Sequence, residues 1–193
     1  MEAYTVYFDL ILCDMNGIIL CNGSPDRYSC AGLHMGRYSW FNQALASHKG
    51  SEYGFEGPLS SPLAEGKNTL IYSCGIREHG QADGKLLGVL GVVFNWDALG
   101  REVLLQARSA LSAETENAVT CYICRPDGII VASSEKVAPG GKITLDNLSE
   151  IIQSKFKIQN GALVGSGLSC GFETYKTGWI SIIMESGAAS GLI

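Results

Sequence analysis

The hydrophobic positions of the chain fall into short runs of strand length, separated by turns that contain glycine. Asn16-Gly17, Asp83-Gly84 and Asp127-Gly128 lie between neighbouring apolar runs, and such dipeptides favour the tight turn of a β-hairpin. The pattern predicts strands over residues 4–13, 17–21, 67–78, 85–96, 119–124, 128–133, 162–174 and 178–185. Much of the chain is therefore expected to form antiparallel sheet.

A helical pattern separates some of these strands. Apolar residues recur at helical spacing between residues 97 and 117, and Asp97 can cap the start of that helix. Shorter helices are predicted over residues 40–47 and 145–156. Each half of the chain then consists of a β-hairpin, a helical middle and a second hairpin. The expected fold class is α+β, with two antiparallel sheets that carry helices on one face and are joined by a helix.

The two halves also share short motifs in the same order. Residues 13–20 (CDMNGIIL) resemble residues 124–131 (CRPDGIIV). Residues 73–78 then resemble 169–173, and residues 87–93 resemble 177–183. Because several matches follow one order, we interpret the chain as two copies of one domain. The expected boundaries are 1–96 for the first module, 97–118 for the connecting helix and 119–193 for a smaller second module.

The hydrophobic content, net charge and cysteine count of the chain argue against some classes of protein function. Hydrophobic residues make up 46% of the chain and charged residues 17%, so there is enough apolar material for a core. The net charge is −5 and the basic residues are scattered, which argues against nucleic-acid binding. The seven cysteines are an odd number and lie mostly in apolar runs. They are interpreted as buried free thiols, which favours a reducing, cytoplasmic location.

No catalytic, metal-binding or cofactor-binding motif is recognisable. His34, His48 and His79 lie in loop-like sequence, away from a nucleophile or a metal-spaced partner. Cys121 and Cys124 are three apart on a predicted strand, so their side chains should point to opposite faces. The sequence therefore predicts no catalytic residue, no metal and no cofactor. A thiol-dependent enzyme, with a cysteine and a histidine brought together by the fold, stays open as an alternative.

A family resemblance rests on four segments of the first half of the chain. They are residues 8–23, residues 38–45 (YSWFNQAL), Tyr72-Ser73 before a turn and the glycine-containing strand 88–96, and together they resemble Cache domains. These are the PAS-like sensor regions of chemotaxis receptors, sensor kinases and diguanylate cyclases. The resemblance implies two tandem PAS-like modules that sense a small molecule for a bacterial signal-transduction receptor. It also implies a fused signalling output domain, a possible homodimer and a location beside a membrane, with a cytoplasmic location as the alternative from cysteine usage.

The expected ligand site lies in the first module. Trp40 and Phe41 would wall a pocket, and an arginine beside them could bind a carboxylate or phosphate. Tyr72 is expected to face the helix at residues 40–47. The expected ligand-binding residues are Arg37, Tyr38, Trp40, Phe41, Tyr72 and Cys74.

The resemblance also bears on the ligand. Amino-acid-binding members carry an aspartate where this sequence has Val93, and a tyrosine where it has Phe41. The expected ligand is therefore a small polar molecule other than an α-amino acid. A ligand-free dimerisation module is the alternative reading.

Overall fold

A computed structural model describes residues 6–113, 119–125, 127–135, 141, 162–165, 168–172 and 178–185. The chain divides into two compact units, Met1–Leu99 and Gly100–Ile193. The predicted helix 145–156 lies outside the described residues. None of the described helices is long and apolar enough to cross a membrane.

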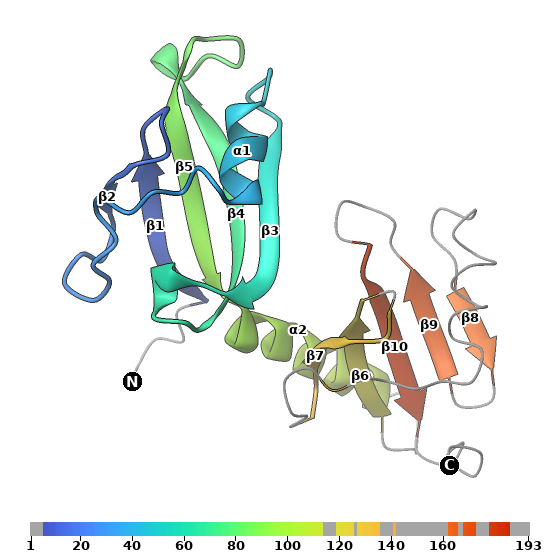
Figure 1. Ribbon diagram of the computed structural model, residues 1–193. Helices are drawn as coiled ribbons and strands as arrows, with labels where there is room; N and C mark the ends of the chain where they lie inside the picture. The colour runs from blue at the N-terminus through green and yellow to red at the C-terminus, as the bar shows by residue number, and fades with distance from the viewer. Residues whose placement is uncertain are drawn as a thin grey trace. The chain divides into compact units, whose positions relative to one another are not determined.

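The first unit is built on a five-stranded antiparallel sheet (Figure 1). Its strand order is β2-β1-β5-β4-β3. Helix α1 (Ser39–Leu45) packs on one face of this sheet. The strands are β1 (Tyr7–Cys13), β2 (Ile19–Asn22), β3 (Tyr53–Ser60), β4 (Asn68–Arg77) and β5 (Leu86–Asn95), and two short 3₁₀ turns are η1 (Pro62–Ala64) and η2 (Glu78–Gly80).

The second unit repeats this topology. Its five strands follow the order β7-β6-β10-β9-β8. This is the order of the first sheet, with β6 to β10 in the places of β1 to β5. They are β6 (Val119–Cys124), β7 (Ile130–Ser133), β8 (Ala162–Gly165), β9 (Leu168–Phe172) and β10 (Ile180–Glu185). The predicted α+β fold with two tandem antiparallel sheets is therefore confirmed. The single strand predicted over residues 162–174 is two strands, β8 and β9.

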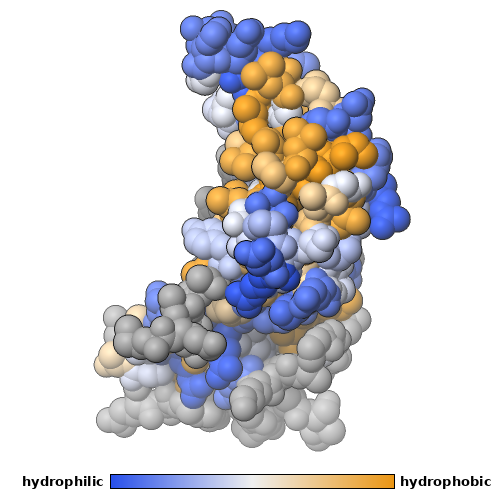
Figure 2. All heavy atoms as spheres, turned by 90° about the vertical axis from the view of Figure 1, so that its left-hand side faces the viewer, coloured by the Kyte–Doolittle hydropathy of each residue, from blue (hydrophilic) through white to orange (hydrophobic). Residues whose placement is uncertain are grey.

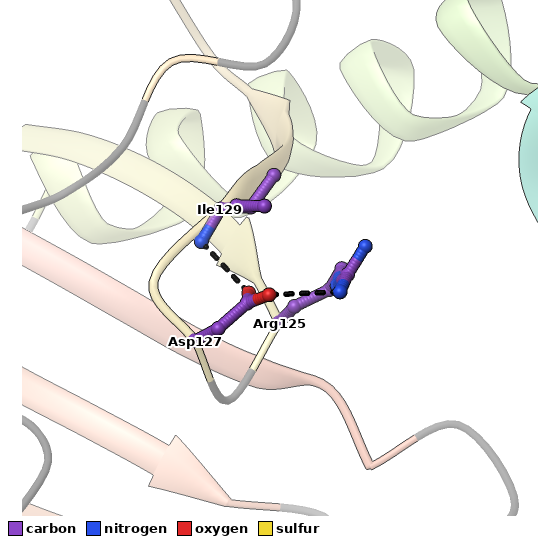
Figure 3. Close-up of polar contacts among 3 residues, drawn as sticks. All are labelled: Arg125, Asp127 and Ile129. Carbon is purple, nitrogen blue, oxygen red and sulfur yellow. Dashed lines mark hydrogen bonds and ion pairs between the residues drawn. The ribbon is translucent and has the colours of Figure 1, made fainter.

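The opening hairpins of the two units are built alike. Gly17 and Gly128 have φ values of 84° and 83°, a conformation that glycine adopts without strain. Asp14 N donates to Ile18 O at 2.9 Å, and Arg125 N donates to Ile129 O at 2.9 Å. In the second hairpin the Asp127 carboxylate accepts from Ile129 N and forms an ion pair with Arg125 at 2.8 Å (Figure 3).

Strand pairing corrects the alignment of the later motifs. Cys13 pairs with Val89 in the first sheet, and Cys124 pairs with Ile180 in the second. Val89 therefore corresponds to Ile180. The sequence match of residues 87–93 with 177–183 had aligned Val89 with Trp179, one residue earlier. A shift of one residue exchanges the two faces of a strand. The first hairpin match, residues 13–20 with 124–131, keeps its register.

Helix α2 (Trp96–Ser112) begins where β5 ends. Asn95 Oδ1 accepts from Ala98 N at 3.3 Å, so Asn95 rather than the predicted Asp97 caps the helix. Further along, Leu104 and Leu111 of α2 pack on the second sheet. Their neighbours there are Val119, Cys121, Ile123, Ala132 and Ile183.

Candidate functional site

Helix α1 lies close to strands β3 and β4 because small residues stand beneath it. A Cβ at Gly54 would overlap the carbonyl oxygen of Trp40, and one at Gly75 would come within 3.5 Å of the carbonyl oxygen of Ala44. The Ser73 hydroxyl donates to the carbonyl oxygen of Trp40 at 2.7 Å. We call this side of the first sheet the covered face. Small side chains at this contact let the helix backbone approach the sheet backbone.

The two aromatic residues that open α1 point into the covered face. Trp40 has no exposed surface and Phe41 is buried, with the ring centroids 6.0 Å apart in an edge-to-face arrangement. The Glu56 carboxylate on β3 accepts from Trp40 N at 3.2 Å and supplies the start of α1 with an acceptor from outside the helix. The sequence pattern did not single out Glu56, because β3 contains glycine and proline and was not predicted as a strand.

Four buried side-chain atoms in the part of the chain that the structure describes lack hydrogen-bond partners: Asn22 Oδ1, Arg77 Nε, Trp40 Nε1 and the Tyr28 hydroxyl. Asn22 and Arg77 make other side-chain hydrogen bonds, to Asp9 and to the carbonyl oxygens of Ser47 and Gly84, whereas Trp40 Nε1 and the Tyr28 hydroxyl are the only polar groups of their side chains. Both side chains belong to the core cluster between the sheet, α1 and the loop that follows β2. Leaving a buried polar group unpaired costs about 1–3 kcal/mol. These groups are therefore the ones that a bound ligand could satisfy, and Tyr28 was not predicted from the sequence.

A buried carboxylate lies beside them on the same face. Asp9 on β1 pairs directly with Val93 on β5, the position where an aspartate was noted as missing. Its oxygen atoms accept from Leu10 N, Ser24 N and Asn22 Nδ2, the last at 2.6 Å. Asp9 thereby anchors the loop that carries Tyr28.

Arg37 and Tyr38 lie at the surface before α1. Arg37 is exposed, and its guanidinium donates to the Tyr38 hydroxyl at 3.1 Å while it lies over the Tyr38 ring. The Tyr38 ring packs partly against the core cluster. Whether either residue contacts a ligand stays a prediction.

Tyr72 and Cys74 are on the opposite face, which corrects the expected orientation of β4. Ile71 and Ser73 point to α1, whereas Tyr72 is 36% exposed and contacts Tyr53, Phe55 and Phe94. Side chains alternate along a strand, so Cys74 shares the face of Tyr72. Trp40 and Tyr72 therefore cannot wall one pocket from their present positions.

Among the described residues of the first unit, Cys30 and His34 do not form a thiol–histidine hydrogen bond. Burial, and then the charge of Asp9, raise the pKa of the Cys30 thiol, which donates to the carbonyl oxygen of Leu63. His34 Nδ1 accepts from Gly36 N instead of a thiol. A raised pKa disfavours the thiolate that thiol catalysis needs.

No family model matches the sequence, and no curated protein matches it. Solved structures do resemble it. An extracellular ligand-binding receptor from Desulfohalobium retbaense has a TM-score of 0.61 at 14% identity, over 92% of this chain and 30% of that one. The DctB histidine kinase sensor domain of V. cholerae has a TM-score of 0.54 at 14% identity, over 92% of this chain and 71% of that one.

A third structure is a chemoreceptor domain. The ligand-binding domain of Pseudomonas fluorescens CtaA, in complex with L-alanine, has a TM-score of 0.53 at 16% identity. The match covers 95% of this chain and 74% of that one. At these identities the likeness concerns the fold. The predicted fold is confirmed, because this chain has the fold of the sensor domains of chemoreceptors and histidine kinases.

Proposed function

We propose that the chain is a small-molecule-sensing domain of a bacterial signalling receptor and that it has no enzymatic activity. The unpartnered Trp40 Nε1 and Tyr28 hydroxyl, buried together on the covered face, carry this proposal. The fold supports it, because the similar structures are sensor domains, and CtaA is in complex with L-alanine.

The ligand binds on the covered face of the first unit, where α1 and the loop after β2 close over the sheet. It presents hydrogen-bond acceptors to Trp40 Nε1 and the Tyr28 hydroxyl. The Asp9 oxygens already accept from Leu10, Asn22 and Ser24, and Val93 offers no charge at the position where amino-acid-binding members carry an aspartate. We therefore retain a small polar molecule other than an α-amino acid. We also propose that Arg37 and Tyr38, which precede α1 at the surface, contact the ligand from there.

The test is a thermal-shift screen of the chain against organic acids, purines, sugars, amines and amino acids. A ligand that binds only the folded state raises the melting temperature by mass action. Tyr28→Phe removes one hydroxyl and should weaken binding of the hit about 3- to 10-fold, the value of one hydrogen bond. Trp40→Phe should weaken it similarly. Tyr72→Phe loses a hydroxyl on the opposite face and is the matched control.

The outcomes separate three cases. Loss of affinity in Tyr28→Phe and Trp40→Phe, with Tyr72→Phe unchanged, supports the site. Loss in Tyr72→Phe alone would move the ligand to the opposite face. Binding of α-amino acids would contradict the ligand class, and the absence of any hit would contradict sensing by this chain.

One observation favours the second candidate, a ligand-free interaction module. Trp40, Ile11, Val89 and Val93 are fully buried, so the covered face is closed by packing. Tyr28→Phe should raise the melting temperature of the free chain under both candidates, because the unpaired hydroxyl costs free energy when it is buried. The candidates differ in the presence of the hit: the affinity for the hit falls about 3- to 10-fold in a sensor, whereas a ligand-free module gives no hit to lose.

A further inference from the structure

The two groups that carry the proposed ligand site are shielded from solvent. Trp40 has no exposed surface and Tyr28 is 2% exposed. A molecule in solution therefore reaches them only when one of the segments over the covered face moves. Two segments lie there, helix α1 and the loop that follows β2.

Helix α1 is the firmly held cover. The Ser73 hydroxyl on β4 donates to the carbonyl oxygen of Trp40. The Gln43 side chain pairs with the backbone of the edge strand β3, where its Nε2 donates to Phe55 O at 3.1 Å and its Oε1 accepts from Phe55 N at 3.2 Å. Moving α1 would break bonds to two strands at once, so the loop is the segment that can move alone.

The loop is tied to the sheet at two glycines. Gly23 N donates to Leu10 O at 2.9 Å, and Gly32 N donates to Ile19 O at 2.8 Å. We call residues 24–31, between these two ties, the lid. Hinges are residues whose backbone can change conformation, and a glycine at each end of the lid supplies them.

The lid has a polar outer side and a buried inner side. Asp26, Arg27 and Ser29 are exposed, whereas Tyr28 and Cys30 belong to the core cluster. In Figure 1 the lid is part of the blue loop beside β2. Figure 2 views the molecule from that side and shows hydrophilic residues next to hydrophobic ones. The Cys30 thiol donates to the carbonyl oxygen of Leu63, so the lid carries a buried thiol of its own.

A buried carboxylate holds the lid closed. Asp9 on β1 is 4% exposed, and no cation among the described residues forms an ion pair with it. Its oxygens accept from Ser24 N of the lid at 2.9 Å and from Asn22 Nδ2 at 2.6 Å. The Asn22 amide also donates to Tyr28 O at 2.9 Å, so it links the carboxylate to the lid. Hydrogen bonds to an ionised group are stronger than neutral ones.

Closure of the lid leaves two polar atoms unpaired. Both amide hydrogens of Asn22 are in use, so a rotated amide would bring its oxygen against two acceptors, Asp9 and Tyr28 O. Asn22 Oδ1 therefore stays an acceptor without a partner, and the Tyr28 hydroxyl has none either. Water can pair with both when the lid opens. Opening of the lid is therefore easier than unfolding of the whole unit.

We propose that residues 24–31 are a lid that opens locally over the covered face, and that Asp9 and Asn22 are its latch. Opening gives a solute a route to Trp40 and Tyr28, and a ligand that binds the Tyr28 hydroxyl favours the closed lid. This use of the lid rests on the proposed function, whereas the opening itself needs no ligand.

The experiment follows the reaction of iodoacetamide with the thiols of the whole chain at pH 8, read by peptide mapping with mass spectrometry. Cys30 lies in the lid, and Cys13 is a buried thiol on β1, outside the lid. Cys30 should react at least tenfold faster than Cys13. Low concentrations of urea should accelerate Cys13 and leave Cys30 unchanged, because local opening exposes little surface.

Variants separate the latch from general stability. Asp9→Asn and Asn22→Ala should each accelerate the reaction of Cys30 by about 10- to 100-fold, the value of a hydrogen bond to a charged group. Asp26→Asn removes the same charge from the exposed side of the lid and should leave the rate unchanged. Gly54→Ala strains α1 whether the lid is open or closed, so it should accelerate Cys13 alone.

Two results would overturn the proposal. If Cys30 and Cys13 react at one rate with one urea dependence, the lid opens only when the unit unfolds. If Asp9→Asn and Asn22→Ala leave the rate of Cys30 unchanged, these residues are not a latch. Should Asp9→Asn fail to fold by circular dichroism, Asn22→Ala decides. A thermal-shift screen without a hit would contradict the proposed function and would leave these rates as they are.

Discussion

Ser73 on β4 donates its hydroxyl hydrogen to the carbonyl oxygen of Trp40 on α1, 2.7 Å away. This bond fixes the first turn of the helix to the centre of the sheet. Gly54 on the adjacent strand stands under the same carbonyl oxygen, so the backbone of α1 is held from two strands. The position of the Trp40 indole is therefore set by two small residues, Gly54 and Ser73, that lie beneath the backbone of the helix.

Gly54→Ala should destabilise the first unit strongly. The added methyl group would overlap the backbone oxygen of Trp40 and the Ser73 hydroxyl, and neither can move without displacing α1. Such overpacking typically costs about 1–3 kcal/mol. The urea midpoint of unfolding, followed by far-ultraviolet circular dichroism, measures this effect. Ser51→Ala, at an exposed loop position before β3, is the control. Equal midpoints for both variants would show that α1 does not rest on Gly54.

The buried thiol of Cys13 should be inert in the folded protein. Burial, and next the charge of Asp14, raise its pKa from 9.0 to about 12. Iodoacetamide at pH 8 should therefore label the exposed Cys21 and label Cys13 only after unfolding in urea. Peptide mapping by mass spectrometry gives the readout. Rapid native labelling of Cys13 would contradict this placement.

The raised pKa of Cys13 also predicts how the free energy of unfolding changes at alkaline pH. The folded state holds the Cys13 proton to higher pH than the unfolded chain does. The resulting stabilisation is complete below about pH 9 and is lost as pH rises through the folded pKa. Cys13→Ala should therefore show a flatter fall in unfolding free energy between pH 8.5 and 10.5, by urea titration. Ser51→Ala, which removes no titratable group, is the control.

The lowered pKa of Asp14 predicts that the protein loses stability as the pH falls. The hydrogen bond from Ile18 N, together with those from Asn16, lowers the pKa of this carboxyl below its usual value of 3.8. Its contribution is present above the unfolded pKa and is lost as pH falls through the folded pKa. Asp14→Ala should reduce the loss of stability between pH 5 and pH 3 in urea titrations. Ser51→Ala, at an exposed loop position that carries no titratable group, is the control.

The sequence pattern predicted most strands but missed β3. Gly54, Gly57 and Pro58 interrupt this segment and read as a loop. The glycine is required by the close approach of α1, a tertiary contact that no local pattern contains. The face of β4 was assigned wrongly for a related reason. Side chains alternate along a strand, so Tyr72 and Ser73 must point to opposite faces of the sheet. Only the packing of α1 decides which of the two faces is covered, and α1 lies on the face of Ser73.

The candidate site was predicted in part. Trp40 and Phe41 were identified from the aromatic pair that opens α1, and both lie on the covered face. Tyr28 was missed because it lies in a loop with no periodic pattern, and its burial depends on Asp9, which anchors that loop from a distant strand. A hydrogen bond between residues far apart in the sequence cannot be predicted from the spacing of neighbouring residues.

The junction of Asn95 and Trp96 leaves no residue between strand and helix. An α-helix turns by about 100° per residue, so one residue inserted into α2 before Leu104 would turn Leu104 and Leu111 by more than a quarter turn relative to the first turn of the helix. The number of residues between the end of β5 and Leu104 is therefore a constraint of length, which an insertion breaks and a conservative substitution keeps.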